Sequence, residues 1–338
     1  MNNNQTRRQF IKKCSQATAS IMLFGACVKG EELSTAEPEV IIKNPRQPLP
    51  NPYVTDDGRP ILVCVEGEDF NQTLSAGLDA LGGLNRLVNS NQNVLIKPNC
   101  NYADPYPGIS SANSVAEIIS AVKQVSSGTV YVGDQGWMHS DEVYEYMGLS
   151  NGVEAADGVL LTFSDENACR AKNPDWTDIQ GYFWVYSEVY DAPAIISLCS
   201  LKRHFLAKMT CALKNNVGAI RGSGMTSSRA VLHDKPQDEF LTTVAEFAGL
   251  INPELNIVDA RSILTRNGPL YQQGTVVTAN KLIICGDMVA TDAYCSQIME
   301  QYDSTFSPSM IDLTLERAQS RGLGTSDLSN VEIIEISI

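Results

Sequence analysis

The sequence lacks most of the local signatures that identify a known chemistry. Its 338 residues include only three histidines and no CxxC or HxxxH pair. It has no P-loop ending in Gly-Lys-Ser or Gly-Lys-Thr, so we do not expect it to bind a nucleoside triphosphate. Because the nine cysteines are widely spaced, no iron–sulfur cluster is expected, and the spacing leaves disulfide pairing open.

Basic side chains and long apolar runs are also scarce. The chain has 25 Lys and Arg against 39 Asp and Glu, a formal charge of −14 at pH 7. Since nucleic acid binding needs a positive surface, nucleic acid is not an expected partner. The apolar stretch from Ala17 to Ala26 is about ten residues long, whereas a helix that crosses a bilayer needs about 20.

The N-terminus resembles an export signal. Arg7 and Arg8 precede the apolar stretch, as in a twin-arginine signal peptide, here residues 1–26. The stretch ends in Leu-Phe-Gly-Ala-Cys27, which resembles a lipoprotein processing site, so either lipid on Cys27 tethers the protein to the membrane or a peptidase removes the signal without lipidation. In both cases we expect the twin-arginine machinery to export a folded protein, with any cofactor already bound, to the periplasm or cell envelope.

The rest of the chain is predicted to contain a linker and an α/β body. Residues 27–60 are rich in proline and acidic residues and lack a hydrophobic period, which is typical of an extended linker. From residue 61 to 338, short apolar runs alternate with helical periods, which predicts one body or two subdomains with mostly parallel, Rossmann-like sheets and flanking helices. In such sheets, ligand-binding residues follow the carboxyl ends of strands.

The run from Leu201 to Lys235 has a charge opposite to that of the rest of the chain. It contains seven basic side chains against one acidic side chain, and two of the three histidines. A bound anion would offset such a concentration of positive charge, although solvated helix faces are the alternative. If the run were one helix, His204 and Lys214 would lie about 15 Å apart, so the segment must bend to serve one ligand.

We therefore predict a cationic site for an anionic small molecule or cofactor. The candidate catalytic residues are His204, Lys202, Lys214 and His233. The candidate ligand-binding residues are Lys97 and Asn99, which follow an apolar strand, Asn215, and the arginines Arg221 and Arg229 that flank a loop rich in glycine and hydroxyl groups. His204 would transfer a proton, and the lysines would stabilise developing negative charge. Two carboxylates, Asp259 and Asp287, are candidates to balance the site or, with the histidines, to bind a divalent metal.

Several segments together resemble a known family. NVLIKPN, LKRHFLAKMTCALKNNVG, NIVDA, NGPLYQQG and GDMVATDAY occur in this order and resemble a bacterial family called domain of unknown function 362. The resemblance extends from about Ile61 to Leu323, and family members commonly have threonine where this chain has Arg203. Because the family name assigns no reaction, the resemblance supports the site and leaves two functions open. One is a metal- or redox-cofactor-dependent enzyme, and the other is a binding protein for a carboxylate or phosphate ligand.

Overall fold

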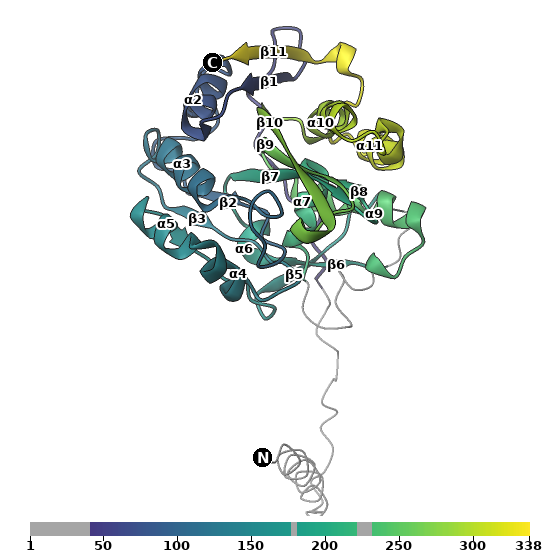
Figure 1. The fold of residues 1–338 in the computed structure, drawn as a ribbon. Helices are drawn as coiled ribbons and strands as arrows, with labels where there is room; N and C mark the ends of the chain where they lie inside the picture. Colours follow the sequence, from purple (N-terminus) through teal and green to yellow (C-terminus); the bar gives the residue numbers. More distant parts are fainter. Residues whose placement is uncertain (1–40, 177–180, 222–231) are drawn as a thin grey trace, which may run out of the picture. The chain divides into compact units, whose positions relative to one another are not determined.

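The computed structural model describes residues 41–176, 181–221 and 232–338, and its central feature is a nine-stranded sheet (Figure 1). Eight strands follow one another across it in the order β11 (Glu332–Ser337), β1 (Ile61–Glu66), β10 (Gly274–Cys285), β9 (Leu255–Arg266), β7 (Ile195–His204), β2 (Val94–Lys97), β3 (Val130–Val132) and β4 (Val159–Leu160). The ninth strand, β8 (Lys208–Thr210), pairs with β7.

Most neighbouring strands run parallel. Every pair from β9 through β7, β2 and β3 to β4 is parallel, as is β1 with β11. The antiparallel pairs are β1 with β10, β10 with β9 and β7 with β8. A separate hairpin joins β5 (Ala168–Ala171) and β6 (Phe183–Tyr186). The predicted α/β class with a mostly parallel sheet is therefore confirmed.

Helices cover both faces of the sheet (Figure 1). One layer consists of α2 (Phe70–Ala80), α3 (Ala112–Lys123), α4 (Ser140–Met147) and α5 (Leu149–Ala155). The opposite side carries α7 (Ala212–Asn215), α9 (Gln237–Ile251), α10 (Met288–Tyr302) and α11 (Asp312–Ser320), while α6 (Ser187–Tyr190) follows β6. Short 3₁₀ helices span Leu84–Arg86, Asn216–Ala219, Tyr271–Gln273, Pro308–Ile311 and Leu328–Asn330.

The alternation of side chains along the strands explains the two layers. In β1, Val63 and Val65 belong to the core that includes α2 and α3, whereas Leu62 and Cys64 belong to the core that includes α10 and α11. Successive side chains of a strand point to opposite faces, so an apolar run without polar interruption is buried on both sides. This is why the strands were recognisable as short continuous apolar runs.

One predicted helix is shorter than its leucine period indicates. The leucines from Leu74 to Leu87 predict one helix, but α2 ends at Ala80. Gly82 and Gly83 follow with φ angles of 86° and 91°, a left-handed conformation that favours glycine and cannot continue an α-helix. Of the last two leucines of the period, Leu84 therefore begins the next 3₁₀ helix and Leu87 is the residue that caps it.

The compact unit begins at Ile41, earlier than predicted, because part of the expected linker is packed against the body. Arg46 is only 6% exposed and donates to Glu254 at 2.8 Å, while Tyr53 is completely buried. A buried ion pair and one aromatic ring hold this segment in place. Neither creates a hydrophobic period, so the sequence pattern did not reveal the packing.

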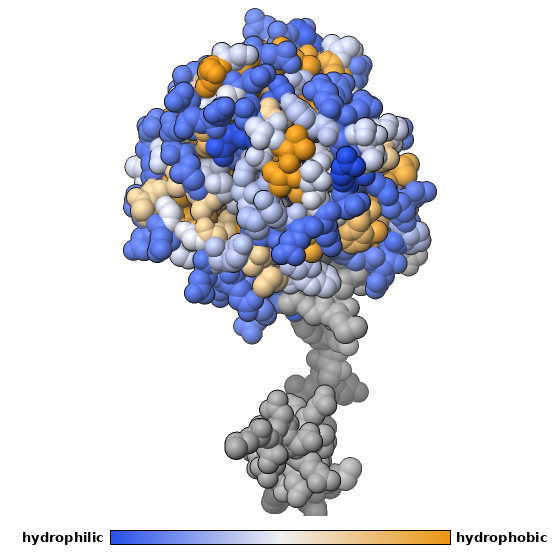
Figure 2. Space-filling model, viewed as in Figure 1, coloured by the Kyte–Doolittle hydropathy of each residue, from blue (hydrophilic) through white to orange (hydrophobic). Residues whose placement is uncertain are grey.

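The visible surface is mainly hydrophilic (Figure 2), and the cysteines of the described ranges are not paired with one another. Figure 2 shows a mainly hydrophilic face on which hydrophobic residues occur in small groups. The seven cysteines in the described ranges are all free thiols. No helix in these ranges is both long and apolar enough to cross a membrane.

Candidate functional site

The charge-reversed run forms a hairpin and a short helix. Strand β7 ends at His204, and β8 returns antiparallel to it with Thr210 opposite Lys202. Helix α7 follows and contributes Lys214 to the same cavity as Lys202 and His204. The predicted bend is therefore present, and it arises from strand pairing rather than from a broken helix.

The hairpin borders a cavity of about 420 Å³ at the carboxyl ends of three parallel strands, β7, β2 and β3. The predicted residues that line it are Lys202, His204, Lys214, His233, Asn99 and Asn215. Its apolar wall is formed by Tyr102, Trp137, Phe205, Leu206 and Leu270. The cavity thus combines a polar and cationic wall with an aromatic one, as small-molecule sites commonly do.

Lys202 is a buried amine at this wall. Lys202 is only 2% exposed. Its Nζ donates to Asn99 Oδ1 at 2.8 Å and to the carbonyl oxygen of Gly108. Burial lowers the pKa of Lys202 to about 8, while the negative charges of Asp104 and Asp134 oppose this shift. Since an unperturbed lysine has a pKa of about 10.4, an appreciable fraction of Lys202 is a neutral amine near pH 8.

His204 is held as a neutral ring that presents one N–H. Its Nδ1 accepts hydrogen bonds from the backbone N–H groups of Leu206 at 3.1 Å and Ala207 at 3.0 Å. Burial, with the charges of Lys214 and Lys202, keeps the pKa of His204 well below its usual value. With Nδ1 accepting, the proton of the neutral ring is on Nε2. The geometry therefore favours a hydrogen-bond donor to an oxygen atom over the proton-transferring role predicted from the sequence.

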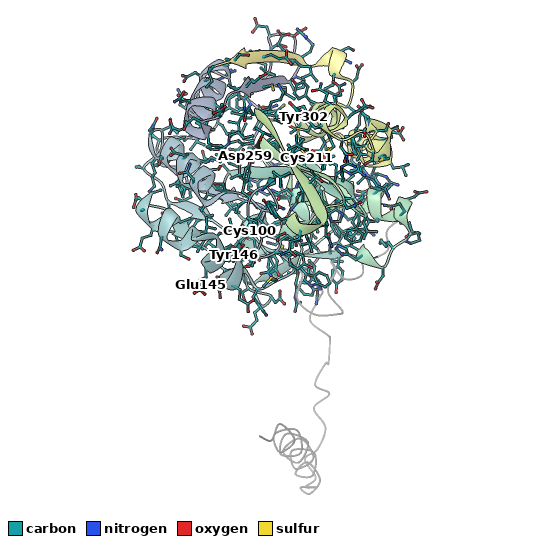
Figure 3. All side chains as sticks on the ribbon, in the orientation of Figure 1. Cys100, Glu145, Tyr146, Cys211, Asp259 and Tyr302 are labelled. Atoms are coloured by element: carbon teal, nitrogen blue, oxygen red, sulfur yellow. The ribbon has the colours of Figure 1, made fainter. Side chains whose placement is uncertain are left out.

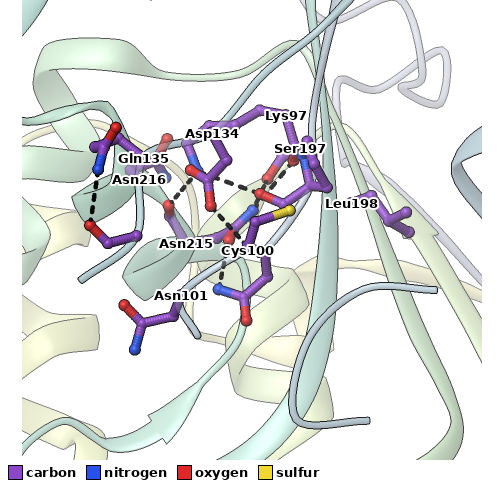
Figure 4. A network of polar contacts seen from close by, with 12 residues as sticks. Lys97, Cys100, Asn101, Asp134, Gln135, Ser197, Leu198, Asn215 and Asn216 are labelled. Atoms are coloured by element: carbon purple, nitrogen blue, oxygen red, sulfur yellow. Dashed lines mark hydrogen bonds and ion pairs between the residues drawn. The ribbon is translucent and has the colours of Figure 1, made fainter. Parts of the chain in front are cut away.

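Lys97 lies beneath the cavity and does not line it, contrary to its predicted ligand contact. Its Nζ is 2.6 Å from Asp134 Oδ1 and donates to the carbonyl oxygen of Asn215 at 2.7 Å, and both charged side chains are buried (Figure 4). The other oxygen of Asp134 accepts from the N–H of Cys100. A Cβ on Gly218 would lie 2.0 Å from Asp134, so glycine is needed for the backbone to pass over this pair.

Two asparagines connect this buried pair to Lys202. Asn99 Nδ2 donates to Asn215 Oδ1 at 3.1 Å. Asn215 Nδ2 in turn donates to Ser197 Oγ at 2.9 Å (Figure 4). Asn99 also accepts from Lys202, so each amide is fixed in orientation by donors and acceptors on both sides. The predicted roles of Asn99 and Asn215 at the site are compatible with this arrangement, although both side chains also stabilise the floor of the cavity.

His233 lies among aromatic rings at the cavity wall. Its ring makes edge contacts with Trp137, at a centroid distance of 6.0 Å, and with Phe240 at 5.6 Å. Phe240 also stacks against His204 at 6.3 Å. The two histidines therefore share one aromatic neighbour, which fixes the rings relative to each other.

The arginine between Lys202 and His204 points away from the cavity. Arg203 lies over the ring of Phe306 at 5.0 Å and is 3.7 Å from Asp303. Adjacent residues of a strand face opposite sides, so Lys202 and His204 share a face and Arg203 does not. The side chain of Arg203 is therefore not part of the cavity wall.

Of the two arginines predicted to bind the ligand, one lies away from the cavity and the other is outside the described residues. Arg221 is 3.6 Å from Asp165 and lies over the ring of Trp184 at 5.4 Å, outside the cavity wall. Arg229 lies outside the described residues, as does all of 222–231. Apart from Arg221, the predicted anion-binding loop therefore lies outside the described residues.

Asp259, predicted as a balancing carboxylate or metal ligand, has a structural role. It accepts from Arg261 and from Ser114, each at 2.8 Å. Figure 3 shows Asp259 apart from Cys100, the residue that follows Asn99 of the cavity wall. This carboxylate joins α3 to β9 and does not line the cavity.

Asp287, the second predicted metal ligand, is the N-cap of α10. Its Oδ1 accepts from the backbone N–H groups of Val289 at 2.8 Å and Ala290 at 2.9 Å, and Oδ2 accepts from Thr325 at 3.0 Å. Within the ranges that the structure describes, no group of three or more His, Cys, Asp or Glu side chains is arranged to hold a metal ion. His204 and His233 line the cavity, whereas neither of the two carboxylates with which a metal site was predicted does.

Several cavity residues were not predicted as site residues. Asp134 was recognisable at a strand end, and Trp137 lies in the loop that follows it. Leu270 and Gln273 come from the NGPLYQQG segment, which contributed to the family resemblance but had no predicted role. Their contact with the cavity depends on the antiparallel pairing of β9 and β10, which no local pattern encodes.

Fold and site together define an α/β protein with a cavity, lined by lysine and histidine residues, at the carboxyl ends of its parallel strands. Residues 94–297 match the family described as Domain of unknown function (DUF362), and the chain belongs to this family. The matched range contains β2, β3, β7, α7 and the segment around Leu270, and so the whole described cavity wall.

Two solved structures are similar at low identity. The lactate racemase apoprotein from Thermoanaerobacterium thermosaccharolyticum is 14% identical with a TM-score of 0.38, over 69% of this chain and 55% of that one. A structural genomics protein from Thermotoga maritima is 13% identical with a TM-score of 0.38, over 70% of this chain and 60% of that one. The match therefore spans less than two thirds of either solved chain. Among curated proteins, none matches significantly.

Proposed function

We propose that the cavity binds a small anionic molecule with an apolar body and that the protein is an enzyme acting on this ligand through the amine of Lys202. One observation carries the proposal: Lys202, His204 and Lys214 all line one cavity. The carboxylate of Asp134 at the same wall is paired with Lys97 at 2.6 Å.

The three groups have complementary chemical capacities. Lys214 supplies a positive charge for a carboxylate or phosphate group. Lys202, with a pKa of about 8, can gain or lose a proton near neutral pH. His204 donates from Nε2 to an oxygen on which negative charge develops, without needing to be charged itself.

The aromatic wall supports an apolar body in the ligand. Trp137 is 60% exposed and Phe205 is 63% exposed, although large aromatic side chains usually gain from burial. Both line the cavity. A ligand with an apolar part would cover these rings while its anionic group contacts the lysines.

Export and a membrane tether complete the proposal. Arg7, Arg8 and the apolar stretch support recognition by the twin-arginine machinery, and Cys27 supports a lipid anchor in the cell envelope. Replacing both arginines by lysine should leave the protein in the cytoplasmic fraction, and Cys27→Ser should release it from the membrane fraction. Normal fractionation of both variants would contradict this part.

Native mass spectrometry of the full-length protein, exported by its own signal, tests the ligand. We expect a small anion to co-purify with the wild type and with Lys208→Gln, and to be absent from Lys214→Gln. Lys208 is a matched control because it lies on the same hairpin but binds Gln237 and does not line the cavity. Equal retention by all three proteins, or no anion in the wild type, would contradict the proposal, and binding without turnover would favour a binding protein.

A further inference from the structure

We propose that Lys202 forms an imine with a 2-oxo acid that carries an apolar side chain. This inference rests on the anionic-ligand function proposed above and adds the reacting group and the ligand class. It starts from the hydrogen bonds of one nitrogen atom.

The contacts of Lys202 Nζ suit a neutral amine. Nζ has two acceptors among the described residues, Asn99 Oδ1 and the carbonyl oxygen of Gly108. A neutral amine donates its two protons to them and keeps its lone pair, whereas an ammonium group has a third proton that no described residue accepts. Lys202 also lines the cavity, so we infer that its lone pair is available to a ligand there.

Desolvation of Lys202 also favours its neutral amine form. Burial lowers the pKa of Lys202 to about 8, so the amine is available as a nucleophile close to neutral pH. Desolvated lysines are a recognised source of amines that react with carbonyl groups. The acidic groups near it, Asp104 and Asp134, are themselves bonded to the N–H of Tyr271 and to Lys97, and so do not form an ion pair with Nζ.

The neighbouring donor suits a carbonyl oxygen. His204 is two residues along β7 from Lys202, which places their Cα atoms about 7 Å apart on the same face of the strand. Its Nε2–H has no hydrogen-bond partner within the described part of the chain. A carbonyl group attacked by Nζ develops negative charge on its oxygen, and this N–H can stabilise it.

The reaction balances without an oxidant or reductant. The lone pair of Nζ attacks the carbonyl carbon, the π electrons move to oxygen, and one proton passes from nitrogen to that oxygen to give a carbinolamine. The C–O bond then breaks, the nitrogen loses its second proton, and the oxygen leaves as water. One amine and one carbonyl compound thus give one imine and one water.

The remaining cavity residues select the ligand class. Lys214 provides a charge for a carboxylate, and a 2-oxo acid has its carbonyl carbon bonded to that carboxylate. Trp137, Tyr102 and Leu270 provide an apolar wall for the side chain of such an acid. A volume of about 420 Å³ is in the range of small-molecule pockets, which suits an aromatic 2-oxo acid such as phenylpyruvate.

Reductive trapping tests the imine. The full-length protein is incubated with phenylpyruvate and sodium cyanoborohydride, and the adduct is located by peptide mass spectrometry. We expect one adduct per chain on Lys202, with a rate that rises towards pH 8. Lys202→Arg should abolish it, Lys208→Arg should leave it unchanged, and excess phenylacetate, which lacks the carbonyl, should suppress it by competition.

The outcomes separate the two proposals. Adducts spread over surface lysines, combined with calorimetric binding of phenylpyruvate and phenylacetate, would overturn the imine and leave the proposed function intact. Absence of binding by both compounds would contradict the proposed function and the imine together. Because mapping is done on the wild type, the result does not depend on whether Lys202→Arg folds.

Discussion

Replacing Lys97 by methionine should strongly destabilise the protein, because its partner would remain charged and buried. Nζ of Lys97 is 2.6 Å from Asp134, with side-chain exposures of 0% and 3%. At this distance, an effective dielectric constant of about 20 gives an attraction of about 6 kcal/mol, which offsets the desolvation of both charges. Removing the cation also leaves the carbonyl oxygen of Asn215 without its 2.7 Å donor.

We therefore expect Lys97→Met to lower the free energy of unfolding by about 3 to 5 kcal/mol. Asp134→Asn alone should cost a similar amount, because it leaves the ammonium group of Lys97 unpaired. The double variant should cost much less than the sum of the single variants, with a coupling energy of at least about 2 kcal/mol. Urea denaturation monitored by circular dichroism measures the free energy of unfolding of all three variants. The comparison requires that the dependence of this free energy on urea concentration is the same in each variant.

A second ion pair provides a control of similar length and different burial. Lys123 is 2.7 Å from Asp157, but their side chains are 25% and 89% exposed. Lys123→Met should change stability by less than about 0.5 kcal/mol, because exposed pairs are screened by solvent. A loss below about 1 kcal/mol for Lys97→Met, or additive losses in the double variant, would refute the reasoning from burial.

Three further predictions concern a tautomer, a pH dependence and an outward-facing side chain. The ¹⁵N NMR signals of His204 should show a neutral ring protonated at Nε2 between about pH 5 and 8; titration near pH 6.5 would contradict this. Burial raises the pKa of Asp292 from 3.8 to about 7, so the folded protein favours the neutral carboxyl group. The contribution of this group to the free energy of unfolding is therefore fully present below about pH 4 and is lost as the pH rises through 7. Asp292→Asn should therefore be more stable than the wild type at pH 8, by up to about 4 kcal/mol, with the difference shrinking towards pH 5; equal pH profiles by urea denaturation would refute this. Arg203→Thr should lower stability by about 1 kcal/mol through loss of its contact with Phe306, yet leave the calorimetric affinity for phenylacetate within twofold of the wild type; a large loss of affinity would place Arg203 at the site.

Much of the fold could be predicted because local patterns determine it. The apolar runs that became β1, β2, β3 and β7 are buried on both faces, so they appear in the sequence as short unbroken strands. The end of α2 could have been placed by Gly82 and Gly83, since paired glycines seldom continue a helix. The packing of Arg46 could not be predicted from a local pattern, because its partner Glu254 is distant in sequence.

The site was predictable in composition but only partly in the role of each residue. Lys202, His204 and Asn99 line the same cavity, because parallel strands bring their carboxyl ends to one edge. This arrangement of strand ends could not distinguish Lys97, whose side chain turns under the edge to meet Asp134. Which strand-end cation faces the cavity depends on long-range pairing, and sequence spacing does not contain that information.

Calorimetric titration of phenylacetate into the wild type and Lys214→Gln, at low and high salt, most directly tests whether the cavity is an anion site. We predict at least a tenfold loss of affinity in Lys214→Gln, equivalent to about 1.4 kcal/mol, and weaker binding of the wild type at high salt. The melting temperatures of the two proteins should agree. Equal affinities of the two proteins, or no measurable binding to either, would contradict the assignment of this cavity.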